Sequence, residues 1–223
     1  MRRPKLTQKQ MEKRLAWCLA NQHREWKFCI WADETHFAFQ KSHNVHNDIV
    51  WSSSSANVPP YETKKYPTHT KCCLFLSYKH CARSDFYLGK LNSSDFRDMI
   101  EKTKIVKEPK RWIQYGQTNQ LFLMLDGDSA HKGEFTKWAK LNKLEVVLLP
   151  PPQSPDLDPA EIFISVVNQQ IDEELLLSKQ ELEDAIDESL LHVKGDTLKH
   201  LALSMSRRVA SIIEANGDHI KKY

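Results

Sequence analysis

Several residue types and patterns are scarce in this 223-residue sequence, and each scarcity excludes a class of protein. Only five cysteines occur, with no Cys-x-x-Cys pair, so neither a disulfide framework nor a zinc knuckle is indicated. The six glycines form no G-x-x-x-x-G-K phosphate loop, and there is no G-x-S-x-G nucleophile elbow. No window approaches the roughly 18 uninterrupted apolar residues of a membrane span. Because the basic N-terminal stretch lacks the apolar core of a signal peptide, we expect a soluble intracellular protein.

The composition is that of a chain with one sizeable core. Hydrophobic residues make up 40% of the sequence, and the length favours a single domain. We expect residues 1–25 to form an N-terminal linker and helix, and residues 26–223 to form the main domain.

The net charge of +3 is small but unevenly distributed. Residues 1–25 carry seven Lys or Arg against two Glu, and residues 64–111 carry twelve against five acids. Residues 161–190 reverse this, with nine acids against one Lys. Basic segments around an acidic one suit a protein that grips a phosphate backbone near a carboxylate site, although solvated helix faces explain the charges equally well.

The apolar pattern predicts strands alternating with helices. Residues 26–39 carry apolar or aromatic side chains at both odd and even positions, as in a central strand buried on both faces. The expected strands are 26–39, 71–78, 84–91, 120–126 and 145–149, and the expected helices are 6–20, 93–106, 132–141, 159–171, 178–193 and 197–215. This order predicts an α/β domain with a mixed five-stranded sheet flanked by helices, in which the hairpin-linked second and third strands are antiparallel.

Capping residues mark several helix starts. Thr7 can cap the first helix, Ser93 or Ser94 the second, and Ser178 the helix at 178–193 through a capping box with Glu181.

Three carboxylates occupy positions that suit phosphodiester chemistry. Asp33 lies inside the apolar strand, where a charge is costly unless it is paired or bound to a metal. Asp126 ends the apolar run 120–126, and Glu161 is the third residue of a helix that Asp158 can cap. Two magnesium ions roughly 3.5 to 4 Å apart can activate a nucleophile and stabilise a leaving oxygen. Because magnesium prefers oxygen ligands, Asp33, Asp126 and Glu161 are predicted to be the metal ligands and catalytic residues.

Each carboxylate also has an ordinary structural explanation, which the sequence leaves open. Asp158 and Glu161 can form a capping box, Asp126 with Gly127 can form a turn, and Asp33 can pair with a Lys or Arg. The combination of the three favours the metal site.

Other metal sites match the sequence less well. The segment that begins at Asp126 fails as an EF-hand, because His131 stands where glycine is required and Lys137 where glutamate is required. His43 and His46 have a ligand-like spacing, but no third ligand lies nearby in the sequence, so loop histidines are the favoured interpretation.

Taken together, three segments resemble the catalytic motifs of the mariner and Tc-type DNA transposases. WADETHF at 31–37 resembles the first-aspartate motif, and LDGDSAH at 125–131 resembles the second. QSPDLDPAE at 153–161 is similar to the third, which has the form Q-S-P-D-L-N-P-x-E. Thirty-four residues separate Asp126 from Glu161, the spacing of the Asp, Asp, Glu branch.

The resemblance implies an RNase H-like fold and cut-and-paste DNA transposition, with metal-dependent cleavage at transposon ends and strand transfer into target DNA. It implies magnesium as cofactor, with manganese as a substitute, held by Asp33, Asp126 and Glu161. The implied partners are double-stranded DNA and a second copy of the chain, with a nuclear location in a eukaryotic host. Asp128 and His131 would neighbour the site, although helix capping explains Asp128 equally well.

Two other hypotheses remain. One is a truncated or host-adopted remnant that binds DNA without cutting it, and the other is a nuclease that acts on RNA in hybrids. The intact carboxylate set argues against the first, and the proline-rich third motif argues against the second.

Overall fold

The computed structural model describes residues 5–39, 68–113, 121–149, 154–172 and 176–220. The strands are β1 (Cys29–Phe39), β2 (Thr68–Ser77), β3 (Cys81–Arg83), β4 (Leu121–Leu125) and β5 (Leu144–Leu148). The helices are α1 (Gln8–Asn21), α2 (Ser93–Lys102), α3 (Pro109–Trp112), α4 (Glu134–Leu141), α5 (Pro159–Asn168), α6 (Lys179–Leu191) and α7 (Gly195–Glu214).

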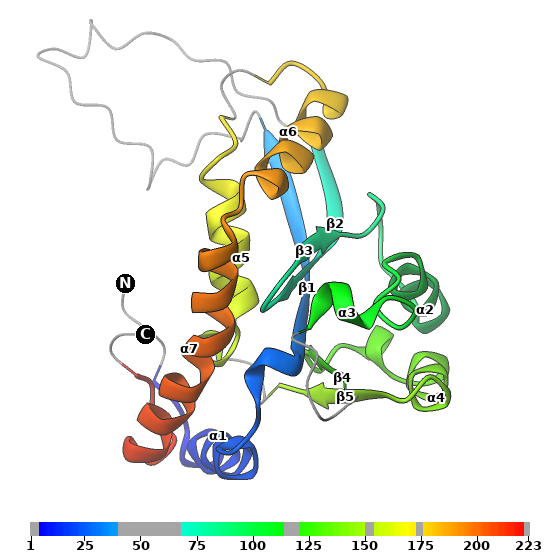
Figure 1. Ribbon diagram of the computed structural model, residues 1–223. Helices are drawn as coiled ribbons and strands as arrows, with labels where there is room; N and C mark the ends of the chain where they lie inside the picture. The colour runs from blue at the N-terminus through cyan, green and yellow to red at the C-terminus, as the bar shows by residue number, and fades with distance from the viewer. Residues whose placement is uncertain (1–4, 40–67, 114–120, 150–153, 173–175, 221–223) are drawn as a thin grey trace, which may run out of the picture.

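The strands form one mixed sheet in the order β3-β2-β1-β4-β5. β2 runs antiparallel to both β1 and β3, whereas β4 runs parallel to both β1 and β5. In Figure 1, α5 and α7 run side by side along one face of the sheet, while α2 and α4 cover the other. The predicted α/β architecture, with a mixed five-stranded sheet flanked by helices, is confirmed.

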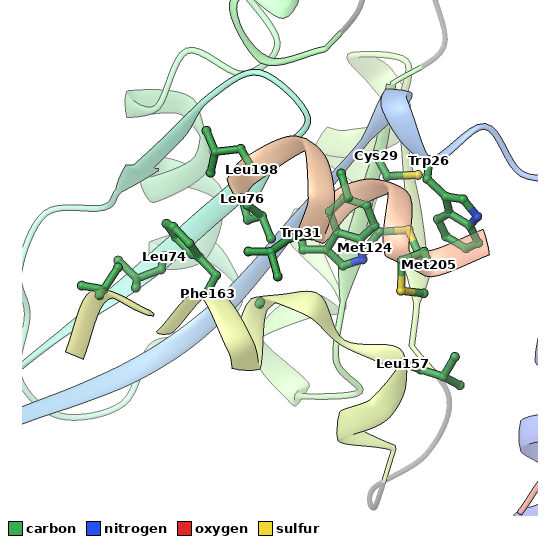
Figure 2. Close-up of a cluster of buried hydrophobic side chains, with 14 of the residues drawn as sticks. Trp26, Cys29, Trp31, Leu74, Leu76, Met124, Leu157, Phe163, Leu198 and Met205 are labelled. Atoms are coloured by element: carbon green, nitrogen blue, oxygen red, sulfur yellow. The ribbon is translucent and has the colours of Figure 1, made fainter. Parts of the chain in front are cut away.

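Alternation along the strands divides the core into two layers. Odd-numbered residues of β1 such as Trp31 pack with Leu74, Leu76 and Met124 towards α5 and α7, as Figure 2 shows. Even-numbered residues such as Ile30 pack on the opposite face, against α2 and α4. A strand that is apolar at both odd and even positions is therefore buried on both sides, as predicted for residues 26–39.

Several predicted boundaries are wrong. The central strand starts at Cys29, because residues 26–28 form a 3-10 turn instead. The third strand lies at 81–83 and not at 84–91, where only Tyr87 forms an isolated bridge. A tight turn after β2 explains this difference. The Ser77 hydroxyl accepts a hydrogen bond from the His80 amide, so the chain reverses within three residues and β3 pairs with β2 from Cys81 onwards.

Helix ends also differ from expectation. Thr7 caps α1 as predicted, but Asn92 caps α2 in place of Ser93 or Ser94, because its side chain accepts the amides of both Ser94 and Asp95. α2 also ends at Lys102, so the expected helix 93–106 is too long, and α3 was not predicted.

The later helices also differ from the prediction at their ends. Ser178 accepts the Glu181 amide as predicted, but the Glu181 carboxylate accepts from Leu177, so the capping box is only half formed. α5 ends at Asn168, three residues before the expected end, and α7 starts at Gly195, two residues before the expected start.

Two further observations concern the cysteines and possible membrane spans. Four of the five cysteines are buried, Cys81 is partly buried, and all five are free thiols. In the ranges that the structure covers, no helix has both the length and the apolar character required for a membrane span. His43 and His46 lie outside the described residues.

Candidate active site

Two of the three predicted carboxylates come from adjacent parallel strands. Trp31 of β1 pairs with Met124 of β4, and Asp33 and Asp126 each follow two residues later. Because parallel strands keep their register, Asp126 lies just past the end of β4 at the level of Asp33, while β1 itself continues to Phe39.

The alternation of side chains places these aspartates on the face that α5 covers. Asp33 has the same parity as Trp31, and Asp126 has the same parity as Met124; both of these apolar residues belong to the core layer under α5 and α7. α5 packs directly on β1 and begins at Pro159, so Glu161 lies in its first turn. The fold thus brings together the elements that carry Asp33, Asp126 and Glu161 near the end of β4.

Asp33 is the partly buried member of the set. Its pKa is raised to about 7, mainly by burial and in addition by the negative charges of Glu161 and then Asp126. Among the described residues, Asp33 forms no ion pair with a Lys or Arg, so the salt bridge that the sequence left open is not formed. The charges of Glu161 and Asp126 thus both act on Asp33, as expected for carboxylates that share one region of the fold.

Asp126 is exposed and is held by local contacts. His131 Nδ1 lies 2.9 Å from its Oδ1 and 3.2 Å from its backbone oxygen, so Nδ1 must carry the proton. The Asp128 amide also donates to Oδ1 at 3.0 Å, which closes a local turn. The His131 hydrogen bond is the largest influence on the pKa of Asp126, which lies below its ordinary value.

His131 itself is buried against Phe96, with ring centroids 4.4 Å apart. Burial lowers the pKa of His131, but its hydrogen bonds to Asp126 and the charge of that carboxylate raise it by more. Asp128 caps the 3-10 turn at 129–131 by accepting the Ala130 amide at 2.7 Å. The helix-capping interpretation of Asp128 is therefore the one that the structure bears out, while His131 orients Asp126.

Glu161 follows a cap that is itself acidic. Asp158 accepts the Ala160 amide at 2.9 Å, as predicted for the N-cap of α5. The pKa of Asp158 is raised to about 7, mainly by burial and in addition by the nearby charge of Asp33. Asp158 therefore adds a fourth carboxyl group to this end of the sheet, which the sequence assigned only to capping.

The donor set is chemically suited to a magnesium or manganese ion. Within the described ranges, no three carboxylate, imidazole or thiol side chains lie close enough to enclose a metal by themselves. Burial is the main cause of the raised pKa values of Asp33 and Asp158, and the crowding of neighbouring negative charges adds to it. Magnesium keeps several of its waters and needs only one or two protein carboxylates, so a cation here would relieve that crowding without a closed cage.

A buried ion pair next to this site was missed from the sequence. Arg14 of α1 donates two hydrogen bonds of 2.8 Å to the Asp156 carboxylate, and both side chains are about 1% exposed or less. Asp156 lies in a 3-10 turn, Pro155–Leu157, just before α5. The one available signal was the spacing of the buried residues Arg14, Cys18 and Asn21, which lie on one face of α1.

Comparison with known protein families decides the family of this chain. The family described as DDE superfamily endonuclease matches residues 28–183, more than half of the chain. The chain belongs to this family. The matched range of the DDE endonuclease includes Asp33, Asp126 and Glu161. No curated protein matches its sequence.

Solved structures of Mos1 transposase share the fold of this DDE endonuclease at low sequence identity. The Mos1 transposase paired-end complex with the left transposon end gives a TM-score of 0.80 at 14% identity, over 99% of this chain and 66% of that one. The catalytic domain of Mos1 mariner transposase gives 0.72 at 14% identity, over 99% of this chain and 100% of that one. The Mos1 mariner paired end complex with Mn gives 0.74 at 15% identity, over 98% and 65%.

These likenesses confirm the RNase H-like fold that the sequence predicted. The chain spans about two thirds of the length of the Mos1 chains in the DNA complexes, and the full length of the isolated catalytic domain.

Proposed function

We propose that this DDE endonuclease is the catalytic domain of a cut-and-paste DNA transposase, which cleaves phosphodiester bonds at transposon ends and joins them to target DNA. One observation carries the proposal: Asp33 of β1 lies level with the end of the adjacent parallel strand β4, which Asp126 follows directly, and α5, which packs on β1, carries Glu161 in its first turn. Three separate elements thus each contribute one carboxylate to this region, and the charges of Glu161 and Asp126 both act on Asp33.

In the proposed mechanism, Asp33, Asp126 and Glu161 hold magnesium, with manganese as a substitute. When bound, the metal supplies an activated water and stabilises the leaving oxygen. His131 keeps the Asp126 carboxylate in one orientation, because its Nδ1 proton donates to that group. The neighbouring core of Trp31 and Met124 keeps water away from one side of Asp33, which favours its binding of a cation.

The partners follow from the reaction and from the relatives. Solved Mos1 complexes contain transposon ends, and others hold Mn or Mg. We infer double-stranded DNA as the substrate of this chain, and a homodimer because two transposon ends must be handled together. In a eukaryotic host this substrate requires a nuclear location. The division into a linker with helix at 1–25 and a catalytic domain at 26–223 stays a prediction.

A plasmid-nicking assay tests the proposal. Supercoiled plasmid is incubated with the purified chain and magnesium or manganese, beside Asp33→Asn, Asp126→Asn and Glu161→Gln, which keep side-chain volume but remove the charge. Asp184→Asn is the matched control, because Asp184 is an exposed acid on α6. We expect nicking by the unmodified chain and the control, and none by the other three variants or in the presence of a chelator.

Other results would contradict this function. Nicking that persists in all three variants would mean that the assigned carboxylates are not the catalytic ones. Absence of nicking with either metal, together with retained DNA binding, would favour the non-catalytic remnant. Preference for an RNA–DNA hybrid over duplex DNA in a competition assay would favour an RNase H-like nuclease.

A further inference from the structure

Three segments distant in sequence converge on Asp156, which is fully buried. Arg14 of α1 binds both oxygens of its carboxylate. Arg208 of α7 donates to its backbone oxygen at 3.1 Å, and the Ile220 amide lies 3.4 Å from Oδ2. A single residue of the third motif is therefore fixed from near both ends of the described chain.

The same contacts tie the two ends to each other. Arg14 Nε donates to the backbone oxygen of Gly217 at 2.9 Å. A Cβ atom added to Gly217 would lie 2.1 Å from the backbone oxygen of Met11, so the segment after α7 packs against α1 without space for a side chain. α1 and the segment after α7 thus form one anchor around Asp156.

The chain between this anchor and Glu161 is short, because Glu161 is only five residues after Asp156. The intervening residues are a 3-10 turn with Pro155, the cap Asp158, and Pro159 at the first position of α5. Leu157 and Ala160 are completely buried, so the backbone cannot rotate without disturbing the core. Because proline fixes φ and buried residues resist displacement, a shift of Asp156 must pass to the start of α5.

We propose that Arg14 and Asp156 are positioning residues for the metal site, setting the place of Glu161 relative to Asp33. The proposal rests on the proposed function, since it assigns a purpose to the position of Glu161. The two-pronged geometry of the pair fixes direction as well as distance, which a single apolar contact would not do. Through this pair, the positions of α1 and of the segment after α7 determine the position of Glu161 relative to the other carboxylates.

The test measures manganese binding by electron paramagnetic resonance, which does not depend on catalytic activity. The variant Arg14→Met/Asp156→Leu removes the ion pair but keeps the volume apolar, an exchange that buried ion pairs often tolerate in stability. Arg83→Met/Asp187→Leu is the matched control, because that pair is also two-pronged, at 2.5 Å, and joins β3 to α6. Circular dichroism and thermal melting check that each variant is folded.

We expect the Arg14/Asp156 variant to bind manganese about tenfold more weakly than the unmodified chain, and the control pair to bind it with unchanged affinity. Arg14→Lys keeps the charge but loses the two-pronged contact, so it should show a smaller loss of affinity. If the double variant does not fold, Arg14→Lys carries the test, and affinity equal to the unmodified chain overturns the inference.

The remaining outcomes separate this inference from the proposed function. A folded double variant that binds manganese as tightly as the unmodified chain overturns the positioning role alone. An unmodified chain that binds no manganese overturns the proposed function, and the inference falls with it.

Discussion

Replacing Asp158 by asparagine should stabilise the metal-free chain near neutral pH and leave its stability unchanged in acid. The asparagine Oδ1 can still accept the Ala160 amide, so the cap of α5 is kept. What is lost is a carboxyl charge whose pKa is raised to about 7 by burial and by Asp33. The substitution therefore separates the electrostatic cost of Asp158 from its capping role.

The magnitude follows from the pKa of Asp158. The rise from 3.8 to about 7 spans about three units, which sets a ceiling of about 4 kcal/mol on the penalty. Because the native pKa lies above the unfolded one, the penalty is absent below about pH 4, grows up to about pH 7 and is constant above it. Asp158 is only partly buried, so solvent and local relaxation should reduce the difference to about 2 kcal/mol.

Urea unfolding in a chelating buffer at about pH 4 and about pH 8 measures this difference. Titrating groups that do not interact with Asp158 are common to both proteins and cancel in the comparison, whereas Asp33 is coupled to Asp158 and contributes to the difference. Asp158→Ala is the control: it removes the charge and the cap together, so it should be about 1 kcal/mol less stable than Asp158→Asn at both pH values. A stability difference between Asp158→Asn and the unmodified chain that is equal at the two pH values would refute the reasoning.

Three further predictions concern stability and reactivity. Gly217→Ala should destabilise the chain far more than Gly89→Ala in thermal melts, because both glycines have positive φ but only Gly217 places a Cβ 2.1 Å from Met11; equal losses would contradict this. Asp156→Ala should lower the free energy of unfolding in urea by about 3 to 5 kcal/mol, since the buried charge of Arg14 loses its carboxylate partner, and a loss under about 1 kcal/mol would argue against it. All five cysteines should react slowly with a thiol reagent until urea is added, because burial raises the pKa of every one; rapid native labelling would be inconsistent.

The carboxylates could be located from the sequence because their signals are local. Asp33 interrupts an apolar strand, Asp126 ends one, and Asp158 caps a helix that contains Glu161. The sequence pattern alone did not show that β1 and β4 are neighbours. That pairing joins residues more than ninety positions apart, and no local periodicity records it.

The errors occurred where a tertiary contact overrode a local pattern. Residues 84–91 were predicted to be a strand. In the structure, the Ser84 hydroxyl accepts a hydrogen bond from the Cys73 amide and donates one to the Asp85 backbone oxygen, so the regular backbone pairing of β3 with β2 ends there. In α1, the apolar residue Leu19 is 46% exposed, while the charged residue Arg14 is buried. The spacing of Arg14, Cys18 and Asn21 places Arg14 on one face of α1, but no local pattern pairs it with Asp156, so only the folded chain reveals the ion pair.

The strand order also dictates when the active site can be completed during synthesis. β1, β2 and β3 are consecutive and antiparallel, so this part of the sheet can form before the rest of the chain leaves the ribosome. β4 then adds on the opposite side of β1 and brings Asp126 beside Asp33. Asp156 receives its contacts from Arg208 and Ile220 only after those residues, which follow it in the sequence, have been made. A growing chain therefore carries the three carboxylates before the contacts that anchor Asp156 are complete.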